Sequence, residues 1–170
     1  MYAEDKQTGE KFEVNIKRVE AQDFKTLKKS ARFDFDWSLY KKDEVYKLSI
    51  TDAKEILGLM RVIDHPEPGY DYLEIDVIEI SKENRGKETG LGRIGGCLLA
   101  YAAILSDEYG HDGFLGLVAK NQKAELFHSK YGFFYIGSIG VMGERMMSDT
   151  GNAIKLIKEY IDKNMTDETK

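Results

Sequence analysis

The sequence has little cysteine, proline or tryptophan, and it contains no long apolar run. Its 170 residues include one cysteine, two prolines, three histidines and one tryptophan. The single Cys97 excludes an internal disulfide, and one cysteine with three histidines does not form the usual zinc-binding spacings. No stretch approaches the roughly 18 apolar residues of a membrane span. We therefore expect no disulfide framework, no metal site and no membrane helix.

Positive charge is also in short supply. Twenty-five basic residues stand against thirty acidic ones, which gives a net charge of −5. Proteins that coat nucleic acids or bind anionic membranes are usually basic, so neither nucleic acid nor membrane is an expected partner. The N-terminal residues 1–11 are charged and lack the apolar middle of a secretory signal. We therefore expect a cytoplasmic protein.

The pattern of apolar residues predicts one domain with a core at about residues 12–147, a C-terminal helix and a frayed tail at 162–170. Three consecutive strands in the middle of the chain predict antiparallel pairing, and the later helices predict crossovers. The expected fold class is therefore α+β with a mixed sheet. The expected strands are residues 12–19, 45–51, 55–64, 72–80, 113–119, 133–136 and 139–142, and the expected helices are residues 21–30, 94–106, 121–131 and 152–161.

Residues 84–96 (NRGKETGLGRIGG) contain five glycines between a strong strand and an apolar helix. Glycine permits close backbone approach, and the free N–H groups at a helix start attract anions. Arg85 and Lys87 add positive charge. The segment therefore favours a phosphate site, although a mobile surface loop is the alternative.

Within this segment, residues 90–95 (GLGRIG) fit the G-x-G-x-x-G pattern of dinucleotide-binding folds. That fingerprint requires a strand that leads almost directly into the first glycine. Here residues 81–89 intervene, and three strands in a row precede the loop where repeated β-α-β units are expected. We therefore reject a nicotinamide or flavin site.

A second motif lies at residues 121–133, where Asn121, Ala124, Phe127, Gly132 and Phe133 follow the pattern N-x-x-A-x-x-[LF]-Y-x-x-x-G-F. Together with the glycine loop and the order of elements, this motif resembles the GNAT N-acetyltransferase superfamily over most of the chain. The resemblance implies a central mixed, mostly antiparallel sheet flanked by helices. It also implies acetyl-CoA as the acyl donor, without a metal.

Three positions depart from the family pattern. In the acyl-CoA loop, Arg93 occupies a slot where the family has glycine, and Gly90 occupies the slot of the leading arginine or glutamine. In the second motif, His128 occupies the tyrosine slot. By resemblance, the strand before the loop would line the pantetheine arm, and the loop would hold the diphosphate with its main-chain amides. The implied cofactor-binding residues are Val77, Ile78, Ile80, Arg85, Gly86, Lys87, Gly90, Gly92, Arg93, Ile94, Gly95, Gly96 and Asn121.

The implied reaction is direct attack of a neutral amine on the thioester. An alkyl amine has a pKa near about 10.4, so a base must remove its proton. Glu79 and Asp76 are the candidate bases, and two solvated carboxylates on a strand edge are the alternative. His128, with Tyr131 as a second candidate, is the expected general acid. His128 could instead be a surface histidine, and Asn121 could cap the helix that it precedes.

The remaining aromatic and histidine residues carry weaker signals. The segment at residues 33–40 (FDFDWSLY) either shapes an acceptor pocket or packs on the sheet, and His65 and His111 are expected in solvated loops. The function implied is transfer of an acetyl group to a primary amine of a small molecule or peptide, in a ternary complex. A catalytically impaired CoA-binding or regulatory module is the main alternative. A toxin-like or nucleic-acid-modifying protein is a weaker one, and a homodimer stays open.

Overall fold

A computed structural model describes residues 1–166, and it is built around a nine-stranded sheet with the order β6-β1-β2-β3-β4-β5-β7-β9-β8. β5 and β7 pair in parallel, and the other neighbours are antiparallel. This confirms the expected α+β fold class. The strands are β1 (Tyr2–Asp5), β2 (Lys11–Arg18), β3 (Glu44–Ile50), β4 (Ile56–His65), β5 (Tyr72–Ile80), β6 (Leu91–Gly92), β7 (Leu115–Ala119), β8 (Phe134–Ser138) and β9 (Glu144–Ser148), and the helices are α1 (Ala21–Lys29), α2 (Ile94–Glu108), α3 (Gln122–Lys130) and α4 (Thr150–Ile157).

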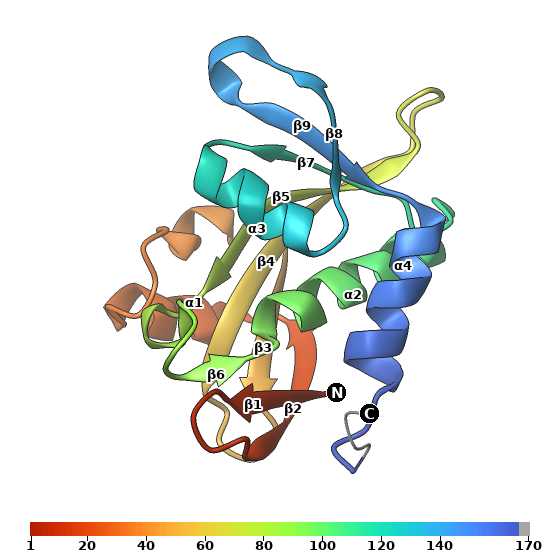
Figure 1. Ribbon diagram of the computed structural model, residues 1–170. Coiled ribbons are helices and arrows are strands. Elements are labelled where there is room, and N and C mark those ends of the chain that lie inside the picture. Colours follow the sequence, from red (N-terminus) through yellow and green to blue (C-terminus); the bar gives the residue numbers. More distant parts are fainter. Residues whose placement is uncertain (167–170) are drawn as a thin grey trace.

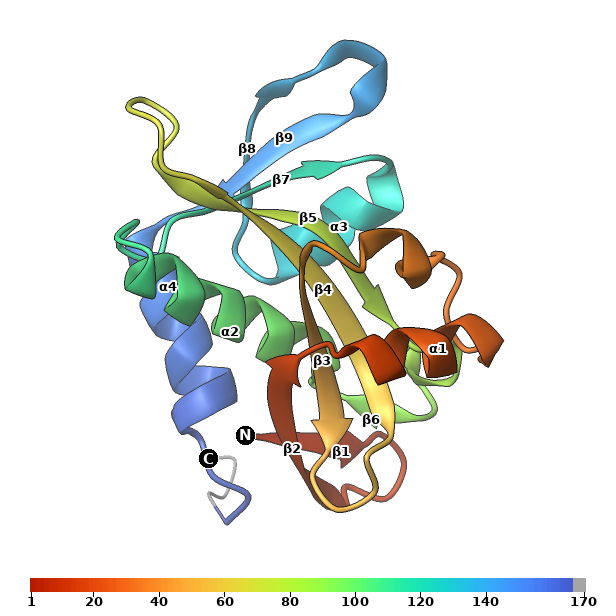
Figure 2. The ribbon, with the colours of Figure 1, turned by 180° about the vertical axis from the view of Figure 1, so that it is seen from behind.

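The helices cover the two faces of the sheet unequally. α2, α3 and α4 lie on one face (Figure 1), and α1 lies on the other (Figure 2). The larger core contains α2, which is buried almost all round because α4 packs against it, with Leu98 and Leu99 fully buried. A smaller core on the α1 face contains Phe24, Leu27 and Trp37. The sheet therefore separates two apolar layers, and both reach β5.

The first and last strands differ from the expected ones. β1 lies outside the expected core of residues 12–147, yet Tyr2 is 2% exposed and Ala3 is 1% exposed. The expected strand at 139–142 is wrong, because these residues contain a 3-10 turn (Gly140–Met142) at the tip of the β8–β9 hairpin. Val141 is fully exposed there. The partner of β8 is β9, a few residues further along the chain.

The C-terminal helix begins earlier than the sequence predicts. α4 starts at Thr150 because Asp149 caps it, accepting a hydrogen bond from the N–H of Asn152 at 2.8 Å. The helix continues as a π-helical turn (Lys158–Asp162). Residues 167–170 of the expected frayed tail lie outside the described residues. Among the helices of residues 1–166, none has both the length and the apolar character to cross a membrane.

Neither of the two histidines expected in solvated loops is free. His65 stacks on Tyr72 and lies 2.6 Å from a Glu74 oxygen. His111 is 4% exposed, and its two ring nitrogens lie 2.6 Å from Asp71 Oδ1 and from Asp64 Oδ1. The imidazole of His111 therefore ties the α2–β7 loop to both sides of the connection between β4 and β5.

This arrangement of His111 predicts a pH-dependent stability. Burial lowers the pKa of His111, but the hydrogen bonds and charges of Asp64 and Asp71 outweigh burial and raise it above 6.5. The stabilisation is therefore fully present below about pH 6.5 and is lost as the pH rises through the higher folded-state pKa. Between about pH 6 and about pH 9, Tm should fall further in the wild type than in His111→Gln. Asp71→Asn should show an intermediate fall, and equal falls in all three proteins would contradict the prediction.

Candidate active site

A cleft opens where the two parallel strands separate. The register pairs Leu73 with Leu115 and Glu74 with Gly116, near the start of both β5 and β7. Beyond these pairs the strands diverge (Figure 1), and a cleft of about 640 Å³ is lined by residues of both. Sites for small molecules and cofactors typically measure about 300–1,000 Å³. The cleft is therefore large enough for an extended cofactor arm and a small reacting group.

A β-bulge reverses the side chains of β5 within this cleft. The pairing of β5 with β4 shifts at Asp76, which is the additional residue. Ile75 packs in the larger core, whereas Val77, two residues further on, packs in the core on the α1 face. Glu79 shares the face of Val77, and Ile78 packs against the larger core. The bulge therefore places Glu79 on the face of the sheet that α1 covers.

The carboxylate of Glu79 is buried and fully engaged. It is 5% exposed. Its Oε1 accepts hydrogen bonds from the N–H of Asp34 at 2.6 Å and from Arg85 at 2.8 Å. Its Oε2 accepts from Trp37 Nε1 at 2.7 Å and from the N–H of Phe35 at 3.4 Å. Four donors match the roughly four acceptor sites of a carboxylate, so Glu79 holds residues 34–37 at the edge of the cleft.

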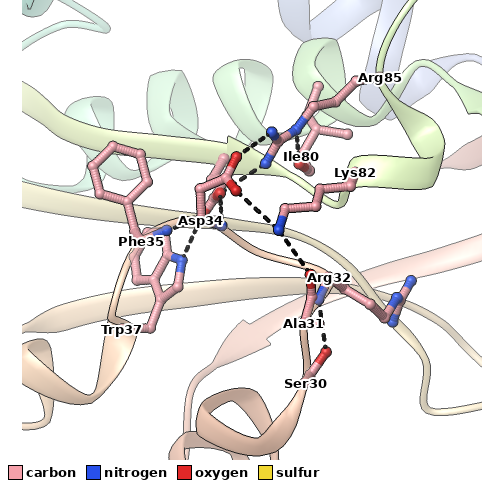
Figure 3. A network of polar contacts seen from close by, with 10 residues as sticks. Ser30, Ala31, Arg32, Asp34, Phe35, Trp37, Ile80, Lys82 and Arg85 are labelled. Atoms are coloured by element: carbon pink, nitrogen blue, oxygen red, sulfur yellow. Dashed lines mark hydrogen bonds and ion pairs between the residues drawn. The ribbon is translucent and has the colours of Figure 1, made fainter.

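The aromatic-acidic segment at residues 33–40 packs on the sheet, as one of the two expectations has it, and also borders the cleft. Phe33 and Trp37 are buried in the smaller core, whereas Asp34 and Phe35 line the cleft. Arg85 bonds Asp34 at 2.5 Å, and Figure 3 shows this guanidinium and the Lys82 ammonium both directed at the Asp34 carboxylate. These hydrogen bonds lower the pKa of Asp34. Asp34 is therefore a paired anion at the rim.

Asp76, the other candidate base, is less enclosed than Glu79. Its side chain is 27% exposed and forms an ion pair with Arg61. Arg61 also lies 3.5 Å from a carboxylate oxygen of Asp43. Asp76 lines the cleft, and it is the more exposed of the two carboxylates.

His128 and Tyr131 both lie in the cleft, on α3 and just after it. His128 is 6% exposed, and burial lowers its pKa to about 4. Among the residues described, its Nδ1 has no hydrogen-bond partner. Burial raises the pKa of Tyr131 to about 12, although the main chain of Gly96 hydrogen-bonds to its hydroxyl. At neutral pH both side chains are therefore uncharged hydrogen-bonding groups.

The glycine-rich loop borders the cleft, but its amides are only partly free. The main-chain N–H of Leu91 donates to Asn84 Oδ1 at 2.7 Å, and β6 pairs with β1. A Cβ at Gly95 would lie 2.8 Å from the Phe127 ring, and one at Gly96 would lie 2.2 Å from the Tyr160 ring. Because these two glycines have no Cβ, the rings of Phe127 and Tyr160 can pack against the first turn of α2.

Arg93 has the backbone of a glycine position. Its φ is +70°, in the left-handed region, which agrees with its place in a glycine slot of the resemblance. Its guanidinium bonds Glu159 Oε1 at 2.8 Å and lies over the rings of Tyr2 and Tyr160. The side chain of Arg93 thus joins the N-terminal strand to the C-terminal π-helical turn.

Most of the residues singled out from the sequence meet at this cleft. Asn121 lines it and also caps α3, accepting a hydrogen bond from the N–H of Ala124 at 2.9 Å, so its two suggested roles are compatible. Lys87, Gly90 and Gly96 are not among the lining residues. The predicted site residues that line the cleft are Asp76, Val77, Ile78, Glu79, Ile80, Arg85, Gly86, Gly92, Arg93, Ile94, Gly95, Asn121, His128 and Tyr131.

Four lysines at the cleft were missed by sequence reasoning: Lys6, Lys120, Lys123 and Lys130. Lys120, Lys123 and Lys130 surround or lie within the second motif, so their basic character was a usable signal. No feature of the sequence pointed to Lys6, because it lies far from the glycine-rich loop in sequence. Within residues 1–166, these four lysines form no ion pair with a carboxylate, and no cluster of three His, Cys, Asp or Glu side chains suits a metal ion.

The mixed sheet, the diverging parallel strands and the flanking helices define the fold of GNAT acetyltransferases, and comparison with solved structures supports this assignment. AtaTR bound with acetyl-CoA has a TM-score of 0.63 at 14% identity, covering 85% of this chain and 98% of the other. The PaiA N-acetyltransferase of Thermoplasma acidophilum with coenzyme A has a TM-score of 0.59 at 16% identity, covering 81% and 99%. A GNAT-family acetyltransferase of Listeria monocytogenes has a TM-score of 0.54 at 15% identity, covering 84% and 96%.

Other structures with this fold are described as a toxin bound to an antitoxin and as a complex with DNA. No protein-family model and no curated protein matches the sequence. At such low identities the likeness establishes the fold, and function has to be argued from the site.

Proposed function

We propose that the protein transfers an acetyl group from acetyl-CoA to a primary amine, by direct attack in a ternary complex. The observation that carries this proposal is the cleft between the diverging β5 and β7. It gathers the glycine-rich loop and the Asn121–His128 motif, which lie on separate parts of the chain, around one space of suitable size. The resemblance in sequence and the likeness in fold point to the same ligand.

In this proposal the pantetheine arm lies along the edge of β5 that has no strand beside it after Glu74. Main-chain groups of residues 77–80 bond the arm and stabilise the oxyanion. The amine nitrogen forms a bond to the thioester carbon, the carbon–sulfur bond breaks, and the amine proton leaves to water or to Asp76. His128 donates a hydrogen bond to the departing sulfur. Glu79 acts as a positioning residue, because its four donors leave no free acceptor site.

One alternative is a CoA-binding module with impaired catalysis. Its supporting observations are the engaged carboxylate of Glu79 and the buried, neutral imidazole of His128, which replaces the tyrosine of the family pattern. In this alternative the protein still binds CoA but does not transfer an acetyl group. The net charge of −5 supports an amine acceptor of a small molecule or peptide over a nucleic acid.

The two readings are separated by binding and turnover measured on the same preparation. Millimolar acetyl-CoA should raise Tm by several degrees, because a ligand at about 100 times its Kd stabilises the folded state by about 2.7 kcal/mol. A panel of small amines, polyamines and peptides should then include a member that triggers thiol release. Stabilisation without thiol release would favour the impaired module. No stabilisation by either acetyl-CoA or CoA would overturn both readings.

A further inference from the structure

The two edges of the sheet differ in how they are protected. In the strand order, β6 and β8 are the outermost strands. β6 is only two residues long, whereas β8 spans five residues and contains neither proline nor a charged residue. Native sheets usually protect an edge with charge, proline or a very short strand, because unpaired main-chain groups can pair with another chain. β8 therefore presents main-chain donors and acceptors that β9, its one neighbour in the sheet of residues 1–166, does not use.

The β8–β9 hairpin also carries one of two long uncharged segments. Charged residues make up 32% of the chain, yet residues 94–106 and residues 131–143 contain none. The first segment lies in α2 and is mostly buried. Most of the second projects beyond the helices in the hairpin (Figures 1 and 2), so burial does not explain its lack of charge. Its exposed large apolar side chains are Phe134, Tyr135, Ile136, Val141 and Met142.

These five side chains, here called the hairpin patch, have the area that one half of an interface needs. A large side chain has roughly 150–250 Å² of surface, so five that are half to fully exposed present on the order of 600 Å². The largest apolar patch on a typical monomer measures about 300–600 Å² and is often functional. A standard interface buries about 800 Å² on each partner, somewhat more than half of it apolar. The hairpin patch therefore meets the apolar requirement of such an interface.

A second copy of this chain is the partner that the hairpin patch suits. In a two-fold symmetric interface a segment meets its own counterpart, so any charge within it would face a like charge. The uncharged residues 131–143 avoid that repulsion. Elsewhere the net charge of −5 makes two copies repel each other, so the hairpin is where their approach is least opposed. A strongly charged partner would be recognised by charges that this segment lacks.

We propose that the protein forms a two-fold symmetric dimer in which β8 pairs in antiparallel orientation with β8 of a second copy. The two sheets then join into one, and the hairpin patches cover each other. The pairing is centred near Ile136, the middle residue of β8, so this side chain lies close to its counterpart. The proposal does not depend on the acetyltransferase activity proposed above.

Sedimentation velocity from about 1 µM to about 100 µM measures the assembly. The wild type should sediment with twice the chain mass of 19.4 kDa. Ile136→Lys and Ile136→Glu each place like charges across the two-fold axis, so each should raise the dimer Kd at least about a hundredfold. Ile154→Lys is the matched control, because Ile154 is an exposed isoleucine on α4, outside the hairpin patch. It should remain dimeric.

Mixing the two charged variants tests the symmetry directly. Ile136→Lys and Ile136→Glu are expected to be monomeric when separate and to form a mixed dimer when combined, because opposite charges then meet. Far-UV circular dichroism checks that each variant is folded, and the same pair of substitutions at the neighbouring exposed Tyr135 replaces any variant that is not. A wild type that stays monomeric throughout, charged variants as dimeric as the control, or folded variants that fail to combine would each overturn the proposal.

Discussion

Glu79→Ala should lower the free energy of unfolding by about 2–4 kcal/mol, because it leaves a buried indole N–H and a guanidinium without their acceptor. The carboxylate joins β5 to residues 34–37, so the same change should loosen the edge of the cleft that Asp34 and Phe35 line. Urea denaturation measures the loss. Glu83→Ala is the matched control, since Glu83 is an exposed partner of Arg32 whose removal should cost less than about 1 kcal/mol.

The variant Glu79→Gln distinguishes a positioning role of Glu79 from a role as general base. Glutamine keeps one acceptor oxygen but presents an NH₂ group to the donors that surround Glu79, so we expect lower stability together with a raised KM for the amine. A general base would behave differently, since its loss lowers kcat by about 10²–10⁴-fold while the fold and substrate binding survive. A stable Glu79→Gln protein with normal KM values and a hundredfold lower kcat would therefore contradict the positioning role.

The bulge in β5 marks a limit of sequence interpretation. The alternation of apolar and polar residues predicts this strand over the residues that form it, 72–80. The alternation changes phase just after Asp76, where Val77 and Ile78 are adjacent apolar residues, and this change of phase is the only mark of the bulge within the sequence of the strand. The enclosure of Glu79 depends further on Trp37 and on the main chain near it, some forty residues earlier. The sequence is compatible with a solvated or a catalytic Glu79, whereas in the structure its carboxylate is buried and accepts four hydrogen bonds.

The hairpin tip and the first strand show two other causes of error. Residues 139–142 contain apolar letters typical of a strand, but glycines at 140 and 143, both with positive φ, mark a turn. β1 is only four residues long and half of it is acidic, so its sequence has no alternating pattern that would predict a strand. Missing β1 also meant missing Lys6. By contrast, the residues of the motif that begins at Asn121 are local in sequence, and in the structure Asn121, His128 and Tyr131 line one cleft.

His128→Phe should lower kcat about a hundredfold and leave the KM for acetyl-CoA nearly unchanged, because it removes a hydrogen-bond donor from the departing sulfur and keeps an aromatic ring between Phe127 and Phe133. The comparison variant is His128→Tyr, whose hydroxyl also donates and which restores the tyrosine of the family pattern. It should retain most of the activity. Steady-state thiol release with an amine from the panel measures both.

The protonation state of His128 gives the sharper test. Since burial lowers its pKa to about 4, the imidazole is neutral throughout the range from about pH 6 to pH 8 and acts as a donor without titrating. The pH profile of kcat/KM over that range should therefore be the same in the wild type and in His128→Tyr. An inflection near the ordinary histidine value of about 6.5, present in the wild type and absent from the tyrosine variant, would mean that His128 gains and loses its proton during turnover. The hydrogen-bonding role would then give way to general acid catalysis, and the cleft would have to admit enough water to charge a side chain that is 6% exposed.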